Sequence, residues 1–162
     1  MFSIPIRVYW EDTDAGGVVY HARYVAFLER ARSDALRAMG HGQQELQQAG
    51  QLFAVASMRL DFLRPARLDD LLQVTAQVVQ VRRASLVFAQ RILREGQVLL
   101  EAEVRVASLR AADFRPCPID GRLHGELESL LAGPMAGGEM REAAGGAAGG
   151  GDNTTTQKET EG

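Results

Sequence analysis

Apolar residues alternate with polar or small ones along residues 3–11, which is the period-two pattern of a β-strand with one buried face. From His21 the period changes to that of a helix. Apolar residues lie on one side as far as Met39, and charged residues such as Arg32 lie mostly on the other. Gly40 follows as a helix stop. The pattern therefore predicts one strand followed by one long helix.

Four strand-like segments follow between Leu52 and Leu109, and none of them has helical periodicity. The last two flank residues 94–97, in which Gly96 can take the positive φ that a tight hairpin needs. One strand, one helix and four consecutive strands predict an α+β fold, because a parallel doubly wound sheet requires alternating strands and helices. The simplest packing wraps a five-stranded antiparallel sheet around the long helix.

Two shorter helices and a tail complete the predicted domain organisation. We expect a polar helix within residues 43–50 and a second helix, apolar on one side, from the N-cap Asp120 to about Leu131. The domain is therefore expected to span residues 1–132. Residues 133–162 are rich in Gly, Ala and polar side chains, which cannot bury enough apolar surface to offset chain entropy. We interpret them as a disordered tail.

Composition and charge narrow the classes of function. The net charge of -3 and pI of about 5.6 offer no basic footprint for nucleic acid. No apolar run approaches the roughly 20 residues that span a bilayer, and the N-terminus lacks the features of a signal peptide. A single cysteine, Cys117, excludes an internal disulfide framework, and three widely spaced histidines form no metal cluster. We expect a cytoplasmic protein without a metal or redox cofactor and without a nucleic-acid partner.

Candidate chemistry is concentrated in residues 9–24, YWEDTDAGGVVYHARY, which join the strand end, a glycine turn and the helix start. Asp14 lies at the mouth of the turn and His21 at the first position of the helix. Free N–H groups and the positive dipole end of a helix start can hold developing negative charge, so a carboxylate facing them indicates acyl transfer or hydrolysis. Taken singly, Asp14 also suits a turn and His21 a helix start. Asp12 would face the same side of an extended strand and is expected to be a structural partner.

A resemblance to known proteins begins with the segment RVYWEDTDAGGVVYHARYVAFLERAR. It is similar to the opening of acyl-CoA thioesterases of the 4-hydroxybenzoyl-CoA thioesterase family, most closely the branch associated with the Tol-Pal system. The later segments LDFLRPARLDDLLQVTAQV, RASLVFAQRI and EAEVRVASL resemble the same branch, so the likeness covers roughly residues 4–131. It implies the hotdog fold, an antiparallel sheet wrapped around a long helix. It also implies dimers that join their sheets edge to edge, with active sites at the subunit interface, often within tetramers.

The resemblance implies roles for individual residues. Asp14 matches the catalytic carboxylate, which acts either as a nucleophile or as a general base. His21 matches the active-site histidine, where a backbone N–H polarises the thioester carbonyl and the side chain orients substrate or water. Ser85 matches a polar turn near the nucleotide end of CoA. Arg82 and Arg83, just before it, are either solvated turn residues or contacts to the CoA phosphates.

We therefore predict an acyl-CoA thioesterase that releases a carboxylic acid and free CoA, with an acyl carrier protein as an alternative thioester carrier. One alternative is a non-catalytic acyl-CoA or acyl-carrier-protein binding module linked to the cell-envelope machinery, which would release no thiol. Another is a hotdog dehydratase, against which the stretch DTDAGGVVYH argues. Arg23 departs from the family pattern, which has a small residue there, and this leaves the acyl-chain preference open.

Overall fold

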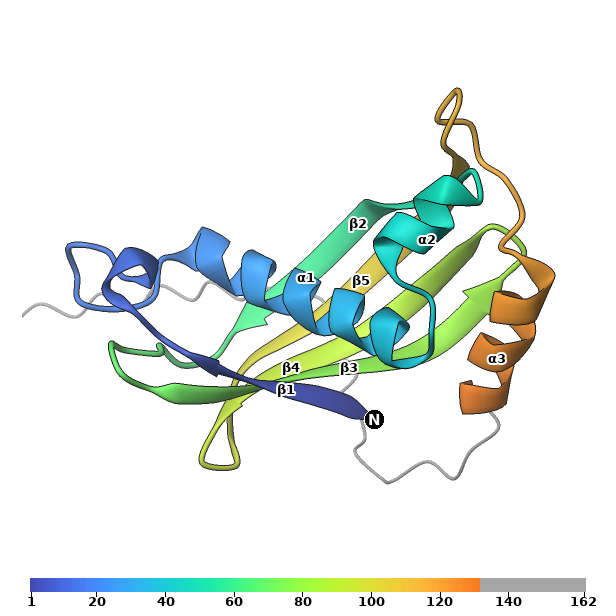
Figure 1. The fold of residues 1–162 in the computed structure, drawn as a ribbon. Coiled ribbons are helices and arrows are strands. Elements are labelled where there is room, and N and C mark those ends of the chain that lie inside the picture. Colours follow the sequence, from blue (N-terminus) through green and yellow to red (C-terminus); the bar gives the residue numbers. More distant parts are fainter. Residues whose placement is uncertain (132–162) are drawn as a thin grey trace, which may run out of the picture.

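The structure, a computed structural model, describes residues 1–131, so the tail expected at residues 133–162 lies outside the described part (Figure 1). The elements follow the predicted order. They are β1 (Phe2–Arg7), the 3-10 turn η1 (Trp10–Asp12), α1 (His21–Ala38), α2 (Gln43–Gln48), β2 (Gln51–Phe62), β3 (Leu71–Arg82), β4 (Ser85–Arg94), β5 (Gln97–Arg110) and α3 (Gly121–Leu131).

The strands form one sheet in the order β1-β3-β4-β5-β2, and every neighbouring pair is antiparallel. The hairpin predicted between β4 and β5 is confirmed. Its two central residues, Glu95 and Gly96, have φ values of 50° and 80°, and positive φ at both positions matches the right-handed twist of paired strands. Strands β1 and β2 are the two edges of the sheet.

Helix α1 lies along one face of this sheet and packs on β1, β3 and β4, while α2 contacts β2 and α3 contacts β3 (Figure 1). Its predicted apolar side is buried through Tyr24, Phe27, Leu28 and Ala31, whereas Ala38 of that side is exposed and Leu36 is buried in addition. A five-stranded antiparallel sheet around one long helix confirms the predicted hotdog fold. No helix in residues 1–131 has the length and apolar character needed to cross a membrane.

The strand predicted over residues 3–11 is too long. Strand β1 ends at Arg7, and the chain then turns through η1, which leaves Trp10 79% exposed. The turn forms because the Tyr9 N–H donates a hydrogen bond to Asp12 Oδ2 at 2.9 Å. Alternation continues along the sequence through this turn, so hydrophobic period alone could not locate the end of the strand.

The assignment of Arg32 to the polar side of the helix is wrong. Arg32 is only 3% exposed, and its Nη1 donates to Gln90 Oε1 at 2.7 Å while its Nη2 pairs with Glu29. The Gln90 amide in turn donates to the carbonyls of Leu28 and Thr75, at 3.1 and 3.0 Å. Burial lowers the pKa of the Arg32 guanidinium, and Glu29 acts in the opposite direction. A connected polar cluster therefore lies between α1 and the centre of the sheet.

Candidate active site

The predicted catalytic stretch forms a closed loop over residues 13–19, called here the Asp14 loop. Thr13 and Val19 form an isolated antiparallel bridge at its base. Next to the bridge, the Tyr20 N–H donates to the Asp12 carbonyl at 2.9 Å. The two ends of the loop therefore meet directly in front of the first residue of α1.

The Asp14 carboxylate is exposed at the surface of this loop. Its Oδ1 accepts a hydrogen bond from the Gly16 N–H at 2.8 Å, and its carbonyl accepts one from the Gly17 N–H at 3.0 Å. Gly17 has a φ of 73°, which glycine adopts without steric cost. Within residues 1–131 no hydrogen-bond partner occupies Oδ2. One carboxylate oxygen is thus held by the backbone while the other faces solvent.

The start of α1 has no side-chain cap. Tyr20 is the N-cap residue, and its side chain makes no capping hydrogen bond, although its carbonyl accepts the Arg23 N–H at 2.8 Å. The His21 side chain is exposed, and its ring lies 4.3 Å from that of Tyr20, centroid to centroid. An uncapped helix start offers its first N–H groups and the positive end of its dipole to an anion.

The loop is also anchored to the turn between β2 and β3. The Val19 N–H donates to the Ala66 carbonyl at 2.9 Å, and the Ala66 N–H donates to Tyr24 Oη at the same distance. Burial raises the pKa of Tyr24 above its usual value, so its hydroxyl stays protonated at neutral pH. The loop, this turn and the first turn of α1 therefore hold one another in place.

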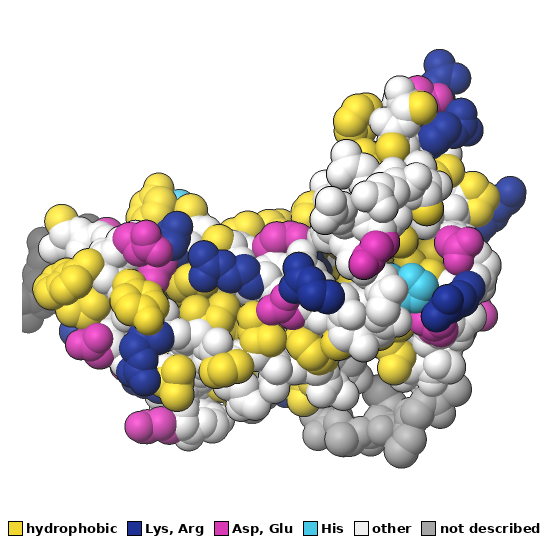
Figure 2. Space-filling model, viewed as in Figure 1, with side chains coloured by type: hydrophobic (Ala, Val, Ile, Leu, Met, Phe, Trp, Pro, Cys, Tyr) yellow, Lys and Arg dark blue, Asp and Glu magenta, His cyan; other side chains and the backbone are white. Residues whose placement is uncertain are grey.

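Apolar side chains gather at the end of the molecule that carries the Asp14 loop (Figure 2). Tyr9, Trp10 and Tyr20 are exposed there, and Phe62, at the end of β2, is 53% exposed although its ring packs edge-on against Tyr24. Exposed aromatic rings at this end of the molecule provide a surface on which an apolar group can lie.

Asp12 is a structural residue, although not in the way that the sequence indicated. It does not lie beside Asp14 on a strand, because it belongs to the 3-10 turn η1. Its side chain is buried there, at 2% exposed. Its Oδ1 accepts a hydrogen bond from Arg23 Nε at 2.6 Å. Arg23, noted above only as a departure from the family pattern, therefore ties the first turn of α1 to the segment before the loop. Sequence spacing did not reveal this pair.

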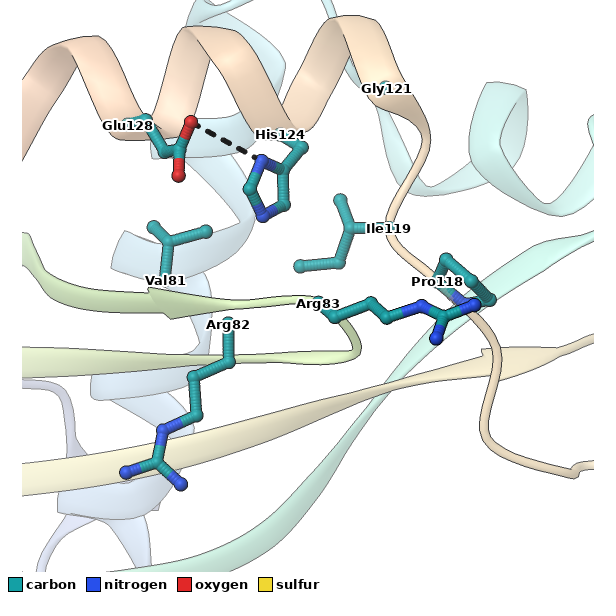
Figure 3. Close-up of a pocket in the computed structure, with 8 residues that line it drawn as sticks. All are labelled: Val81, Arg82, Arg83, Pro118, Ile119, Gly121, His124 and Glu128. Carbon is teal, nitrogen blue, oxygen red and sulfur yellow. Dashed lines mark ion pairs between the residues drawn. The ribbon is translucent and has the colours of Figure 1, made fainter.

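The other predicted group lies at the turn between β3 and β4. Arg82 and Arg83 line a cavity of about 500 Å³ between this turn and α3, and Ser85 is half-buried at the start of β4. Figure 3 shows the Arg82 guanidinium on the opposite side of β3 from α3, whereas the Arg83 side chain extends toward Pro118. The two guanidinium groups therefore point in different directions.

The same cavity contains a histidine that the sequence analysis did not single out as a site residue. His124 of α3 is half-buried, faces β3 and lies 3.5 Å from Glu128 through its Nδ1 and a carboxylate oxygen (Figure 3). Its neighbour in sequence, Leu123, is fully buried. The signal available in the sequence was the amphipathic pattern of α3, in which a residue next to a core leucine lies at the boundary of the buried side.

The two predicted groups of site residues, at the Asp14 loop and at the β3–β4 turn, lie at opposite ends of the sheet (Figure 1). The Asp14 loop bonds to Ala66, shortly before β3 begins at Leu71, whereas Arg82 is the last residue of β3. Twelve extended residues cover about 36 Å. A single chain therefore brings Asp14 and His21 to one end of the sheet and places Arg82, Arg83 and Ser85 at the other.

Comparison with known proteins agrees with this fold. A model of the thioesterase superfamily matches residues 16–101. The chain belongs to the thioesterase superfamily.

Among its relatives, acyl-CoA thioesterase YbgC of Haemophilus influenzae is 47% identical over 71% of this chain and 85% of that protein. Acyl-CoA thioester hydrolase YbgC of Escherichia coli O6:H1 is 48% identical over 72% of this chain and 87% of that protein. The crystal structure of a probable thioesterase from Bartonella henselae is similar with a TM-score of 0.69 at 35% identity, and the match covers 72% of this chain and 97% of that one.

Proposed function

We propose that this chain hydrolyses acyl-CoA thioesters at the Asp14 loop, with Asp14 as the reacting carboxylate and the start of α1 as the oxyanion site. Its relatives named acyl-CoA thioesterase or acyl-CoA thioester hydrolase are 47% and 48% identical over most of their length, and this chain is likewise an acyl-CoA thioester hydrolase. The observation that carries the assignment of the site is the closed loop that holds a carboxylate with a free oxygen in front of an uncapped helix start.

Hydrolysis of the thioester to a carboxylic acid and free CoA needs water as the only co-reactant. The Asp14 carboxylate either attacks the thioester carbonyl or removes a proton from an attacking water molecule. The carbonyl oxygen gains negative charge, which the N–H groups of the first turn of α1 stabilise, and the His21 side chain orients substrate or water. The C–S bond then breaks, and CoA leaves as a thiolate that takes up the proton lost by the water molecule. In the direct-attack route, water then hydrolyses the anhydride between the acyl group and Asp14, which releases the carboxylic acid and restores the carboxylate. The exposed rings of Tyr9, Trp10 and Phe62 provide an apolar surface for the acyl group.

We further propose that a second copy of the chain joins at the edge strand β2. The other edge, β1, has six residues and contains Pro5, which lacks the N–H that strand pairing requires. Strand β2 has twelve residues and no proline, and Val55 and Phe62 are exposed along it. An open edge with exposed apolar side chains favours pairing with an identical strand.

Such a dimer would complete the site. A two-fold axis at β2 reverses the partner's sheet, so its β3–β4 turn comes to the end of the sheet where the first chain holds the Asp14 loop. We propose that Arg82, Arg83 and Ser85 of one copy bind the nucleotide end of CoA while Asp14 and His21 of the other act on the thioester. The dimer itself can assemble further into a tetramer.

Subunit complementation tests this composite site. Asp14→Asn is co-expressed with a second variant, Arg82→Gln/Arg83→Gln, under different tags, and the mixed dimer is purified. One of its two sites then combines an intact Asp14 with intact arginines from the other copy. At substrate concentrations well below KM, the mixed dimer should show about half of the wild-type activity, because free thiol is released at that site.

The two unmixed variants serve as controls, and each should fall far below the mixed dimer. A mixed dimer no more active than the sum of its parents would refute the composite site. A double arginine variant that keeps the wild-type KM would refute the phosphate contact. Absence of thiol release from every acyl-CoA by the wild-type protein would overturn the proposed function and favour a binding module.

Gly16→Ala is expected to lower kcat about tenfold, because the added Cβ displaces the Asp14 carboxylate by a few tenths of an ångström and even small misplacements of a reacting group are costly. A Cβ added at Gly16 would lie 3.0 Å from Asp14 Oδ1, closer than ordinary van der Waals contact. Gly17→Ala is the matched control, since a Cβ there meets nothing within 4 Å but has to adopt a φ of +73°. It should cost about 1 kcal/mol of stability with a smaller effect on kcat. Equal kcat values for the two variants would contradict the role of the Asp14 contact.

The single cysteine and the family resemblance indicate a cellular setting for the enzyme. We place the enzyme in the cytoplasm, where the lone Cys117 would remain a thiol. An acyl carrier protein as the thioester carrier, and association with the Tol-Pal system, stay predictions from the family resemblance. Thiol release from acyl-CoA beside the matched acyl-carrier-protein thioester would rank the two carriers.

A further inference from the structure

We propose that Arg23 is a positioning residue that acts through the buried carboxylate of Asp12. By holding Asp12 it keeps the Asp14 loop in register with the start of α1. This inference rests on the proposed function, in which Asp14 reacts and the first turn of α1 binds the oxyanion. It adds a residue that touches neither the substrate nor the reacting atoms.

Asp12 joins three parts of the site. Its Oδ2 accepts the Tyr9 N–H at 2.9 Å, and its Oδ1 accepts Arg23 Nε at 2.6 Å. Its backbone carbonyl accepts the Tyr20 N–H at 2.9 Å. The residue therefore links the turn before the loop, the N-cap of α1 and the first turn of α1.

The two reacting groups lie next to this junction in the chain. Asp14 follows Asp12 by two residues, and His21 follows Tyr20 directly. Any shift of Asp12 relative to α1 therefore moves the carboxylate relative to the helix start. Alignment of a reacting group to within about 1 Å governs rate more strongly than it governs binding, so the effect should appear in kcat.

Arg23 is the charged partner on which Asp12 depends. A carboxylate that is 2% exposed is costly to bury unless it is paired, and the Arg23 guanidinium supplies that pair, with its Nη2 lying 2.5 Å from Oδ1. The second contact of Arg23, to Glu11 at 3.4 Å, is solvent-exposed and contributes little. The main role of the side chain is therefore its pairing with Asp12.

The test compares Arg23→Met, which removes the charge and keeps much of the stem, with Arg23→Lys, which keeps the charge. Arg30→Met is the matched control, because Arg30 is an exposed arginine of the same helix that lies over the Phe27 ring. kcat and KM for one acyl-CoA are measured well below the lowest unfolding midpoint. We expect Arg23→Met to lose about 10- to 100-fold in kcat with little change in KM. Arg23→Lys should recover part of this loss, and Arg30→Met should match the wild type.

A double-mutant comparison separates positioning from general loss of structure. If Arg23 acts through Asp12, adding Arg23→Met to Asp12→Asn causes no further loss of kcat, because the pair is already broken. Wild-type kcat in Arg23→Met, equal losses in Arg23→Met and Arg30→Met, or fully multiplicative losses in the double variant would each overturn the proposal. These results leave the proposed function standing as long as Asp14→Asn is inactive, whereas an active Asp14→Asn would remove the proposed function itself.

Discussion

Asp14→Asn is expected to lower the turnover of acyl-CoA by about two to four orders of magnitude while the fold survives. The asparagine Oδ1 can still accept the Gly16 N–H, so the turn keeps its hydrogen bond. The neutral amide can neither attack a thioester nor take a proton from water. Because the carboxylate is exposed, its loss leaves no buried charge unpaired. Free-thiol release and thermal unfolding, measured together, check both halves of the prediction.

Asp113→Asn is the matched control for this experiment. Asp113 is also exposed, and its Oδ1 accepts the N–H of Arg115, two residues later, at 3.1 Å. It thus shares the turn geometry of Asp14 but lies after β5. Turnover of this variant should equal that of the wild type. An Asp14→Asn protein that retains full activity would remove Asp14 from the mechanism.

A single turnover in water labelled with oxygen-18 distinguishes the two roles of Asp14. If Asp14 attacks directly and water then hydrolyses the anhydride at the Asp14 carbonyl, the first carboxylic acid released carries an oxygen from Asp14, and the label enters the protein. Label in the protein therefore identifies direct attack. If Asp14 acts as a general base, the label appears in the acid during the first turnover and the protein stays unlabelled; an anhydride that water hydrolyses at its acyl carbonyl gives the same pattern. Mass spectrometry of the product and of the peptide that contains Asp14 reads both outcomes.

Gln90→Leu should lower the free energy of unfolding by about 3 kcal/mol. The substitution keeps an apolar shape beneath α1 but deprives Arg32 Nη1 of its acceptor, and it removes the donor to the carbonyls of Leu28 and Thr75. Arg32 is too deeply buried to recover that hydrogen bond from bulk water. Urea unfolding should show a lower midpoint with an unchanged slope.

Gln80→Leu provides the comparison for this stability effect. Gln80 lies on the neighbouring strand β3 and is exposed, so the same chemical change should stay within about 0.5 kcal/mol. If both leucine variants unfold at the wild-type midpoint, the cluster around Arg32 contributes nothing measurable to stability.

Features that depend on neighbouring residues were predictable from the sequence. The hairpin between β4 and β5 follows from Gly96 between two alternating segments, and its positive φ confirms the reason. Helix α3 begins where Asp120 was expected to cap it, because Asp120 Oδ1 accepts the N–H groups of Arg122 and Leu123. Caps, turns and hydrophobic period all act over a few residues, so a local stretch contains the information.

Features that depend on distant partners were not predictable in this way. Arg32 lies on the polar side by helical spacing, yet it is buried because Gln90, 58 residues later, offers an acceptor beneath the helix. Asp12 is buried in the turn after β1 because its carboxylate pairs with Arg23 in α1. In both cases a charged residue enters the interior only because a partner from another element compensates its desolvation.

The candidate site also has one part that local sequence determined and one part that depends on distant partners. By itself the sequence determined the order of the elements and the loop that places Asp14 and His21 at a helix start, because these residues are close in the chain. Only the tertiary structure decided that Arg82 and Arg83 lie at the far end of the sheet, since that depends on the direction and length of β3 and on the elements packed at each end. Sequence periodicity reports which face of a strand is buried, whereas the packing of all elements decides which ends of the strands meet.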